Sequence, residues 1–154
     1  MNLIVACDKD YGIGCDNKLP DWKIEESELS KIDMKNFTKL TVGDGNNIVI
    51  MGRKTFESLP NGALKNRLNI VISRQSEFNH CKCFDNLLDA YNYSKDYVSK
   101  SGGEIWVIGG SHIYEESIRL NLVEKVYVTK FKQRYNCDTY LGPLTIEFIN
   151  NQLN

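Results

Sequence analysis

The sequence lacks any apolar stretch approaching the roughly eighteen residues that a membrane span requires. It also lacks an excess of charge of one sign, because 19 basic residues face 20 acidic ones and the net charge is −1. We therefore expect neither a membrane nor nucleic acid as a partner. The first eight residues carry no basic segment, so they indicate a buried strand rather than a secretory signal.

Cysteines are few and odd in number, with five in 154 residues. A chain of this length builds a core without disulfides, so we expect reduced thiols in a cytoplasmic protein. Cys81 and Cys83 lie beside His80, but a metal site needs more ligands, and we expect none. Apolar residues make up 42% and charged residues 25%, which excludes a disordered chain and indicates one folded domain, residues 1–154.

Short apolar runs alternate with segments of helical periodicity. We expect strands at 3–7, 48–51, 68–73, 104–108, 123–131 and 144–149, with a loop at 8–19. We expect helices at 27–40, 87–98 and 111–118, with Ser27 or Ser30 capping the first and Ser111 the third. This alternation predicts an α/β domain with a central, mostly parallel sheet flanked by helices.

Three strand ends carry residues suited to an extended, phosphate-bearing cofactor. In parallel sheets, ligands bind beyond these ends, where glycine permits close approach and the first N–H groups of a helix favour phosphate. An ordinary solvated helix start is the alternative, and the pair of glycines is not a G-x-G-x-x-G fingerprint. The three junctions are Gly52-Arg53-Lys54-Thr55, Ser73-Arg74 and Gly109-Gly110-Ser111.

One acid stands out on the predicted helix at 27–40. Asp33 lies between Ile32 and Met34 and shares a helical face with Phe37, four residues later. Burial on such a face would raise the pKa of the carboxyl toward that of a general acid working near neutral pH. If the helix is rotated, Asp33 is instead an ordinary solvated acid, and the pattern alone leaves both interpretations open.

A series of motifs runs in order along residues 3–143. It comprises Leu3-Ile4-Val5-Ala6, Gly12-Ile13-Gly14, Leu19-Pro20 with Trp22, Asp33-Met34 with Phe37, Met51-Gly52-Arg53-Lys54-Thr55, Arg67 with Asn69-Ile70-Val71, Ile108-Gly109-Gly110-Ser111-His112-Ile113-Tyr114, and Val126-Tyr127-Val128-Thr129. This series resembles dihydrofolate reductase. The resemblance implies reduction of 7,8-dihydrofolate to tetrahydrofolate by NADPH, with hydride transfer to C6 and protonation at N5. It also implies a place in one-carbon metabolism, with thymidylate synthase as a fused or associated partner.

The resemblance further implies a set of site residues. Asp33 would orient the pterin and assist protonation through a water, with Thr129 holding its carboxylate and Trp22 in a mobile loop at 12–22. Arg67 would bind the glutamate tail, and a cis peptide would join the paired glycines. The implied substrate-binding residues are Ile4, Val5, Ala6, Asp33, Met34, Phe37, Leu59, Leu64, Arg67 and Ile108. The implied NADPH-binding residues are Ala6, Ile13, Gly14, Gly52, Arg53, Lys54, Thr55, Ser73, Arg74, Gly109, Gly110, Ser111, His112, Ile113 and Tyr114.

The chain departs from the family pattern in three places, of which the lengthened turn at Gly43-Asp44-Gly45 is expected to be harmless. Trp22 precedes Asp33 by eleven residues, about twice the family's gap, so we expect a longer loop before the helix. Keeping the gap would make Glu28 the acid, but Asp33 is preferred because an aromatic residue follows it by four. Only eleven residues follow Pro143, so we expect the C-terminal strands to be incomplete and an edge strand to be exposed.

Two other functions remain open at this stage. A riboflavin-pathway reductase would share the sheet and the NADPH site, although Trp22, Asp33, Arg67 and Thr129 together suit a pterin with a charged tail. A folate- or nucleotide-binding homologue that has lost activity through the altered loop is the second alternative.

Overall fold

The computed structural model describes residues 1–75 and 77–153. Within these residues, six strands form one sheet in which every neighbouring pair is parallel. Their spatial order is β5 (Cys81–Phe84), β4 (Leu68–Ile72), β3 (Ile48–Gly52), β6 (Ile105–Val107), β1 (Asn2–Cys7) and β7 (Lys125–Lys130). The predicted α/β class with a central parallel sheet is therefore confirmed.

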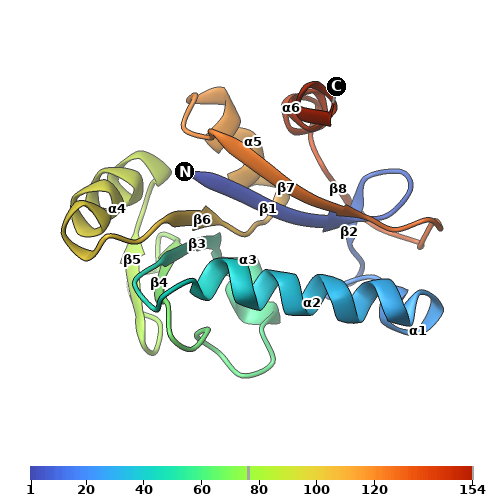
Figure 1. The fold of residues 1–154 in the computed structure, drawn as a ribbon, viewed down its shortest axis with the longest axis horizontal. Coiled ribbons are helices and arrows are strands. Elements are labelled where there is room, and N and C mark those ends of the chain that lie inside the picture. Colours follow the sequence, from blue (N-terminus) through green and yellow to red (C-terminus); the bar gives the residue numbers. More distant parts are fainter. Residues whose placement is uncertain (76, 154) are drawn as a thin grey trace.

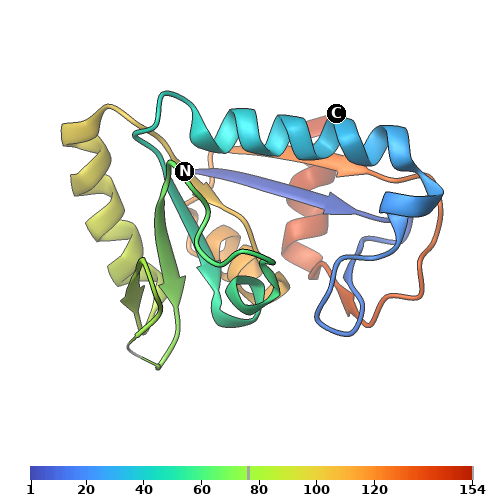
Figure 2. The same ribbon diagram turned by 90° about the horizontal axis from the view of Figure 1, so that it is seen from below.

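A short antiparallel pair and the helices surround this sheet. The pair consists of β2 (Gly12–Gly14) and β8 (Thr139–Tyr140). The helices of the described chain are α1 (Trp22–Glu25), α2 (Ser27–Val42), α3 (Arg53–Ser58), α4 (Leu87–Ser101), α5 (Ser111–Arg119) and α6 (Pro143–Leu153). Figure 1 and Figure 2 show α2 running along one side of the sheet, while α5 and α6 lie on the other.

The alternation of side chains along each strand divides the core into two layers. Leu3 and Val5 of β1 point into the larger layer, which α4, α5 and α6 cover. Ile4, between them, points into the smaller layer, which contains Trp106 and is covered by α2 and α3. Both faces of the central strands are therefore buried, which explains their continuous apolar runs.

The predicted strand at 144–149 is wrong, because these residues lie within α6. Pro143 occupies the first position of the helix, where its missing N–H removes no intrahelical bond. The Glu115 carboxylate of α5 accepts hydrogen bonds from the Leu144 and Thr145 N–H groups, at 2.8 and 3.1 Å. Ile149 is 2% exposed and packs into the larger core layer, so tertiary contacts fix a helix where the short apolar run suggested a strand.

Several predicted boundaries are also corrected. The N-cap position of α2 is Glu26 rather than Ser27 or Ser30, because the Glu26 backbone makes the turn from α1. Gly110, not Ser111, is the N-cap of α5, and the Ser111 hydroxyl instead donates to the Tyr140 carbonyl at 2.6 Å.

The segments on either side of these helices also differ from expectation. The extra residues before Asp33 form the short helix α1 rather than a longer loop, and the predicted loop at 8–19 contains β2. Strand β5 was not predicted. No helix in the described part of the chain has the length and apolar character needed to cross a membrane.

Candidate active site

The ends of β3 and β6 bring two of the predicted phosphate-binding junctions into contact. The Gly52 N–H donates to the Gly109 carbonyl at 2.9 Å, and the Gly109–Gly110 peptide is cis, as the resemblance implies. A Cβ on Gly109 would lie 3.3 Å from Thr55 Oγ1 and 3.5 Å from the Tyr114 hydroxyl oxygen. Glycine at this position therefore fits against the first turn of α3 without a tight side-chain contact, and we call the junction of Gly52, Gly109 and Gly110 the glycine cradle.

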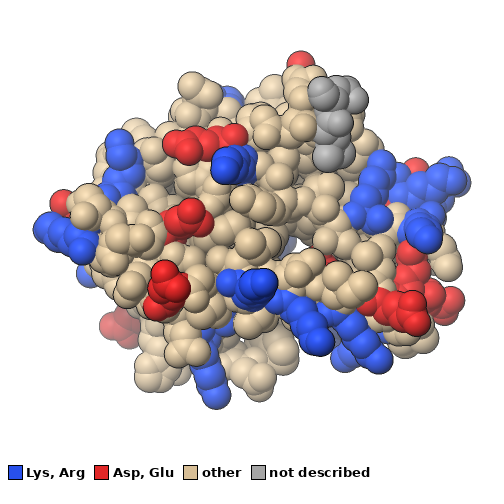
Figure 3. Space-filling model, viewed as in Figure 1, with Lys and Arg blue, Asp and Glu red and all other residues tan. Residues whose placement is uncertain are grey.

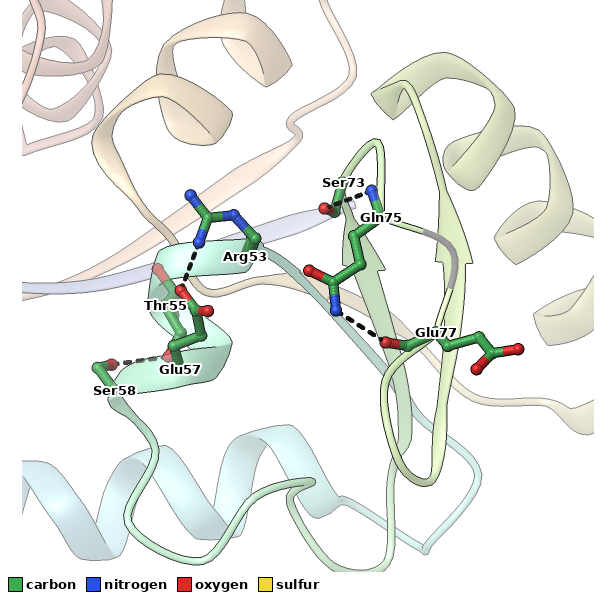
Figure 4. A network of polar contacts seen from close by, with 7 residues as sticks. All are labelled: Arg53, Thr55, Glu57, Ser58, Ser73, Gln75 and Glu77. Carbon is green, nitrogen blue, oxygen red and sulfur yellow. Dashed lines mark hydrogen bonds and ion pairs between the residues drawn. The ribbon is translucent and has the colours of Figure 1, made fainter.

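Basic side chains stand beside this cradle. Arg53 at the start of α3 pairs with Glu57, with 2.7 Å between Nη1 and Oε1. Figure 4 shows Arg53 and Ser73 at neighbouring strand ends, where Ser73 Oγ accepts the Gln75 N–H at 3.1 Å. A pocket of about 340 Å³ lies here and is lined by Asn17, Arg53, Lys54, Glu57 and Ser58. The loop after β2 therefore reaches α3 and encloses a polar groove.

The remaining predicted cofactor residues are more scattered. Ile113 is buried under the cradle, with Cγ1 3.3 Å from the position of a Cβ on Gly52. Ile13 and Gly14 lie on β2, which is held by β8. The His112 side chain is 88% exposed, and its Nε2 lies 3.5 Å from Glu116 Oε2. Arg74 is exposed directly after β4.

Asp33 projects from α2 toward β7. Burial raises the pKa of its carboxyl, and a hydrogen bond from the Thr129 side chain partly opposes that rise. Thr129 is opposite Ala6 in the pairing of β7 with β1. Glu28, the alternative acid, is exposed on the same helix. Asp33 is therefore the acid that the fold places in a partly desolvated position between α2 and the sheet.

Five of the ten predicted substrate-binding residues belong to the smaller core layer or pack against it. Ile4 is buried in it at 9% exposure, and four partly buried residues pack against the same layer: Phe37, Leu59, Leu64 and Ile108. Tyr114 contacts the backbone of β1 from the opposite core layer, because its hydroxyl donates to the Ile4 carbonyl at 2.7 Å. Val5 points into the opposite layer, and Met34 is 51% exposed at the rim of α2.

Arg67 lies at the opposite end of α2 from Trp22. Its Nη1 donates to Thr41 Oγ1 at 2.9 Å, and its Nε donates to the Lys65 carbonyl at 2.8 Å. Burial lowers the pKa of the guanidinium, which nevertheless stays charged at neutral pH. The fold thus places a partly buried carboxyl near the middle of α2 and a hydrogen-bonded cation at the C-terminal end of that helix.

Trp22 is 2% exposed and lies within an aromatic cluster. Its ring stacks on Phe131 with 4.3 Å between centroids and meets Tyr135 edge-on at 6.0 Å. Glu26 fixes this cluster, because its carboxylate accepts the Lys132 N–H at 2.8 Å and the Tyr135 hydroxyl at 2.6 Å. Figure 3 shows acidic and basic side chains gathered at this end of the molecule.

Asp8, like Glu26, is a carboxylate that the sequence patterns did not single out. It is 1% exposed, and Oδ1 accepts the Gly12 N–H while Oδ2 accepts the Tyr135 N–H, at 2.8 and 2.9 Å. Burial alone would raise its pKa, but these hydrogen bonds and one from Asp10 lower it overall. No local pattern indicates Asp8 or Glu26, because their shared partner Tyr135 lies 127 and 109 positions away in the sequence.

Comparison with known proteins identifies the family. The family model described as dihydrofolate reductase matches residues 1–151. The dihydrofolate reductase of Rattus norvegicus is 32% identical over 155 residues, covering 96% of this chain and 81% of the relative. That of Drosophila melanogaster is 32% identical over 158 residues, covering 96% and 82%.

Bifunctional relatives match as well. The bifunctional dihydrofolate reductase-thymidylate synthase of Paramecium tetraurelia is 36% identical over 143 residues, covering 92% of this chain but 28% of the relative. The chain therefore spans only about a quarter of such bifunctional relatives. The resemblance inferred from the ordered motifs is confirmed by these matches.

Proposed function

This chain belongs to the dihydrofolate reductase family, an oxidoreductase family of folate metabolism that uses NADPH, and we propose that residues 1–154 form one reductase domain that converts 7,8-dihydrofolate to tetrahydrofolate. The observation that carries the proposal is the position of Asp33, half-buried on α2 beside Thr129 and next to the apolar layer around Ile4. This acid suits a flat heterocycle whose edge presents an amino group and a ring N–H side by side.

Asp33 would bind and orient the pterin. A carboxylate accepts both pterin hydrogen bonds at once, and the apolar side chains of Ile4 and Phe37 would contact the ring faces. Because burial raises its pKa, Asp33 is more easily protonated than a surface acid and can assist delivery of a proton to N5 through a water. Thr129 would fix the orientation of the carboxylate.

The junction at the ends of β3 and β6 fits the cofactor. The glycine cradle beside Thr55 leaves room for backbone and phosphate to approach, and Arg53 and Lys54 border the polar groove. When bound, NADPH supplies the hydride that adds to C6 of the pterin, while N5 takes up a proton. We propose that the α5 start around Ser111 and the α3 start around Thr55 hold its pyrophosphate.

Arg67 would bind the far end of the substrate. Its guanidinium donates to Thr41 and to the Lys65 carbonyl, and its remaining N–H groups can donate hydrogen bonds to a carboxylate. Dihydrofolate carries an α-carboxylate on its glutamate tail, which matches a cation at the end of α2 away from Trp22.

The loss of NADPH absorbance in the presence of dihydrofolate tests the proposal directly. Turnover that requires both compounds is the expected result. Tight methotrexate binding without turnover would instead indicate a folate-binding homologue that has lost activity, and the absence of both would overturn the proposal.

We also propose that the chain works beside a thymidylate synthase, fused to it or associated with it. The support is the set of bifunctional relatives, whose names join the two activities. Analytical ultracentrifugation of the chain mixed with a thymidylate synthase from the same cell should show a complex if the two associate. Two independently sedimenting species would contradict association.

A further inference from the structure

The geometry points to Asn69 as the positioning residue for the cation that binds the substrate tail. This inference rests on the proposed role of Arg67. It adds an explanation of how the guanidinium is held in the orientation that binds the substrate tail. Asn69 lies on β4 and is 2% exposed, although its side chain is polar. A buried amide of this kind has to satisfy its donors and acceptor within the protein.

All the side-chain hydrogen bonds of Asn69 go to one short segment of backbone. Its Oδ1 accepts the Leu64 N–H at 2.8 Å, and its Nδ2 donates to the Leu64 carbonyl at 2.8 Å. Nδ2 also donates to the Arg67 carbonyl at 2.9 Å. The amide therefore holds both ends of the segment 64–67, which runs from the smaller core layer to the cation.

The anchor itself cannot shift easily. Asn69 is paired with Val49 on one side and with Cys81 on the other, within the parallel sheet. Neighbouring strands thus fix its backbone from both sides, and the side chain transmits that order to a segment without regular structure. Leu64 and Arg67 lie close in sequence but outside this ladder, so they depend on Asn69 for a single conformation.

The position of the guanidinium follows from this segment. Arg67 Nε donates to the carbonyl of Lys65, which lies between the two points that Asn69 fixes. Arg67 Nη1 then reaches Thr41 Oγ1, and the Thr41 hydroxyl donates to the Phe37 carbonyl at 2.7 Å. If the segment loosens, the Lys65 carbonyl moves and the Arg67 guanidinium is no longer held in one orientation. Charged bidentate contacts are sensitive to such a change.

The test compares two substrates that differ only in the tail. Steady-state kinetics of Asn69→Ser are measured with 7,8-dihydrofolate and with 7,8-dihydropteroate, which lacks the glutamate. We expect kcat/KM for dihydrofolate to fall about tenfold, mainly through KM, and that for dihydropteroate to change less than about twofold. Asn69→Asp, which preserves shape but removes both donors, gives the same test if the serine variant does not fold.

Controls separate this inference from the proposed function. Asn86→Ala removes the side-chain cap of α4, far from the cleft, and should reduce stability without changing the ratio between the substrates. Arg67→Leu should abolish the preference for dihydrofolate over dihydropteroate. Adding Asn69→Ser to Arg67→Leu should cause no further loss of kcat/KM for dihydrofolate. If Arg67→Leu leaves the ratio unchanged, the role proposed for Arg67 is wrong. If Arg67→Leu changes it but Asn69→Ser and Asn69→Asp affect both substrates equally, Asn69 is only structural and the inference is overturned.

Discussion

The Tyr135 hydroxyl donates a 2.6 Å hydrogen bond to Oε2 of Glu26 and thereby ties the segment after β7 to the start of α2. The same carboxylate accepts N–H groups of Lys132 and Gln133, at 2.8 and 3.3 Å. Seven residues after Glu26, the pKa of the Asp33 carboxyl on α2 is raised by burial, and the side chain of Thr129 on β7 partly opposes that rise. Glu26 therefore attaches the start of α2 to the segment that follows β7, and Trp22 is enclosed at this point of attachment by Phe131 and Tyr135.

Glu26→Gln should loosen this attachment. Burial would raise the pKa of Glu26, but hydrogen bonds from Tyr135, Lys132 and Gln133 lower it overall. Its stabilisation is therefore complete above the ordinary pKa of about 4.3 and is lost as the pH falls through the lower pKa of the folded protein. At pH 7 we expect a loss of about 1 kcal/mol, measured by urea unfolding.

Glu28→Gln is the matched control, because Glu28 is exposed on the same helix. It should leave the free energy of unfolding within about 0.5 kcal/mol of the wild type. An equal loss in the two variants would show that the effect comes from net charge and not from the contacts of Glu26.

Asp33→Asn should separate activity from stability. The amide cannot become the acid, so kcat should fall by about a hundredfold or more at pH 7 and by less at acid pH, where the substrate arrives already protonated. Because burial raises the pKa of Asp33, its charge opposes folding at pH 7, and this cost disappears as the pH falls below the ordinary carboxyl pKa.

The variant should therefore unfold at a higher urea concentration than the wild type at pH 7, with the gain vanishing at low pH. A pH series of urea midpoints and initial rates provides both measurements. Wild-type turnover at pH 7 would mean that another group is the acid, and Glu28 would be tested next.

The sequence predicted the parts of the molecule that depend on local pattern. Strands β1, β3 and β4 are short, mainly apolar segments buried on both faces, and the motifs around Gly109 and Asp33 are contiguous. Strand β5 was missed because its residues, Cys81–Phe84, include a lysine and form no apolar run. The run 144–149 was misassigned because its short length does not distinguish strand from helix.

The missed parts of the site depend on contacts between distant residues. The hydrogen bond between Glu26 and Tyr135 joins positions 109 apart, and the one between Glu115 and Thr145 joins positions 30 apart. No pattern within a short window contains such pairs. Asn69 was quoted within a motif, but its function depends on the backbone groups that surround its side chain.

Gly109→Ala should disturb the cofactor cradle. Gly109 has φ +131°, a backbone conformation that residues with a side chain rarely adopt. The Cβ of an alanine here would meet Thr55 Oγ1 at 3.3 Å. We expect the dissociation constant of NADPH to rise by about tenfold or more, as measured by fluorescence titration. Gly102→Ala is the control, because Gly102 also has a positive φ, +78°, but has nothing within 4 Å of the added methyl. It should lower stability and leave NADPH affinity unchanged, and equal affinity losses would locate the effect in backbone strain alone.

Glu115→Gln should release α6 from the rest of the fold. Burial would raise the pKa of Glu115, but the Leu144 N–H and the Thr145 N–H and hydroxyl lower it overall by hydrogen bonding. Negative charge at a helix N-terminus is favourable, so the substitution should cost about 1 kcal/mol at pH 7. The difference between the variant and the wild type should shrink as the pH falls through the pKa of the folded protein, because the wild-type carboxylate then becomes protonated too. Hydrogen exchange should accelerate first in residues 144–152. Glu116→Gln on the same helix should not produce this acceleration, and a uniform increase across the sheet would show that Glu115 supports the whole domain instead of α6.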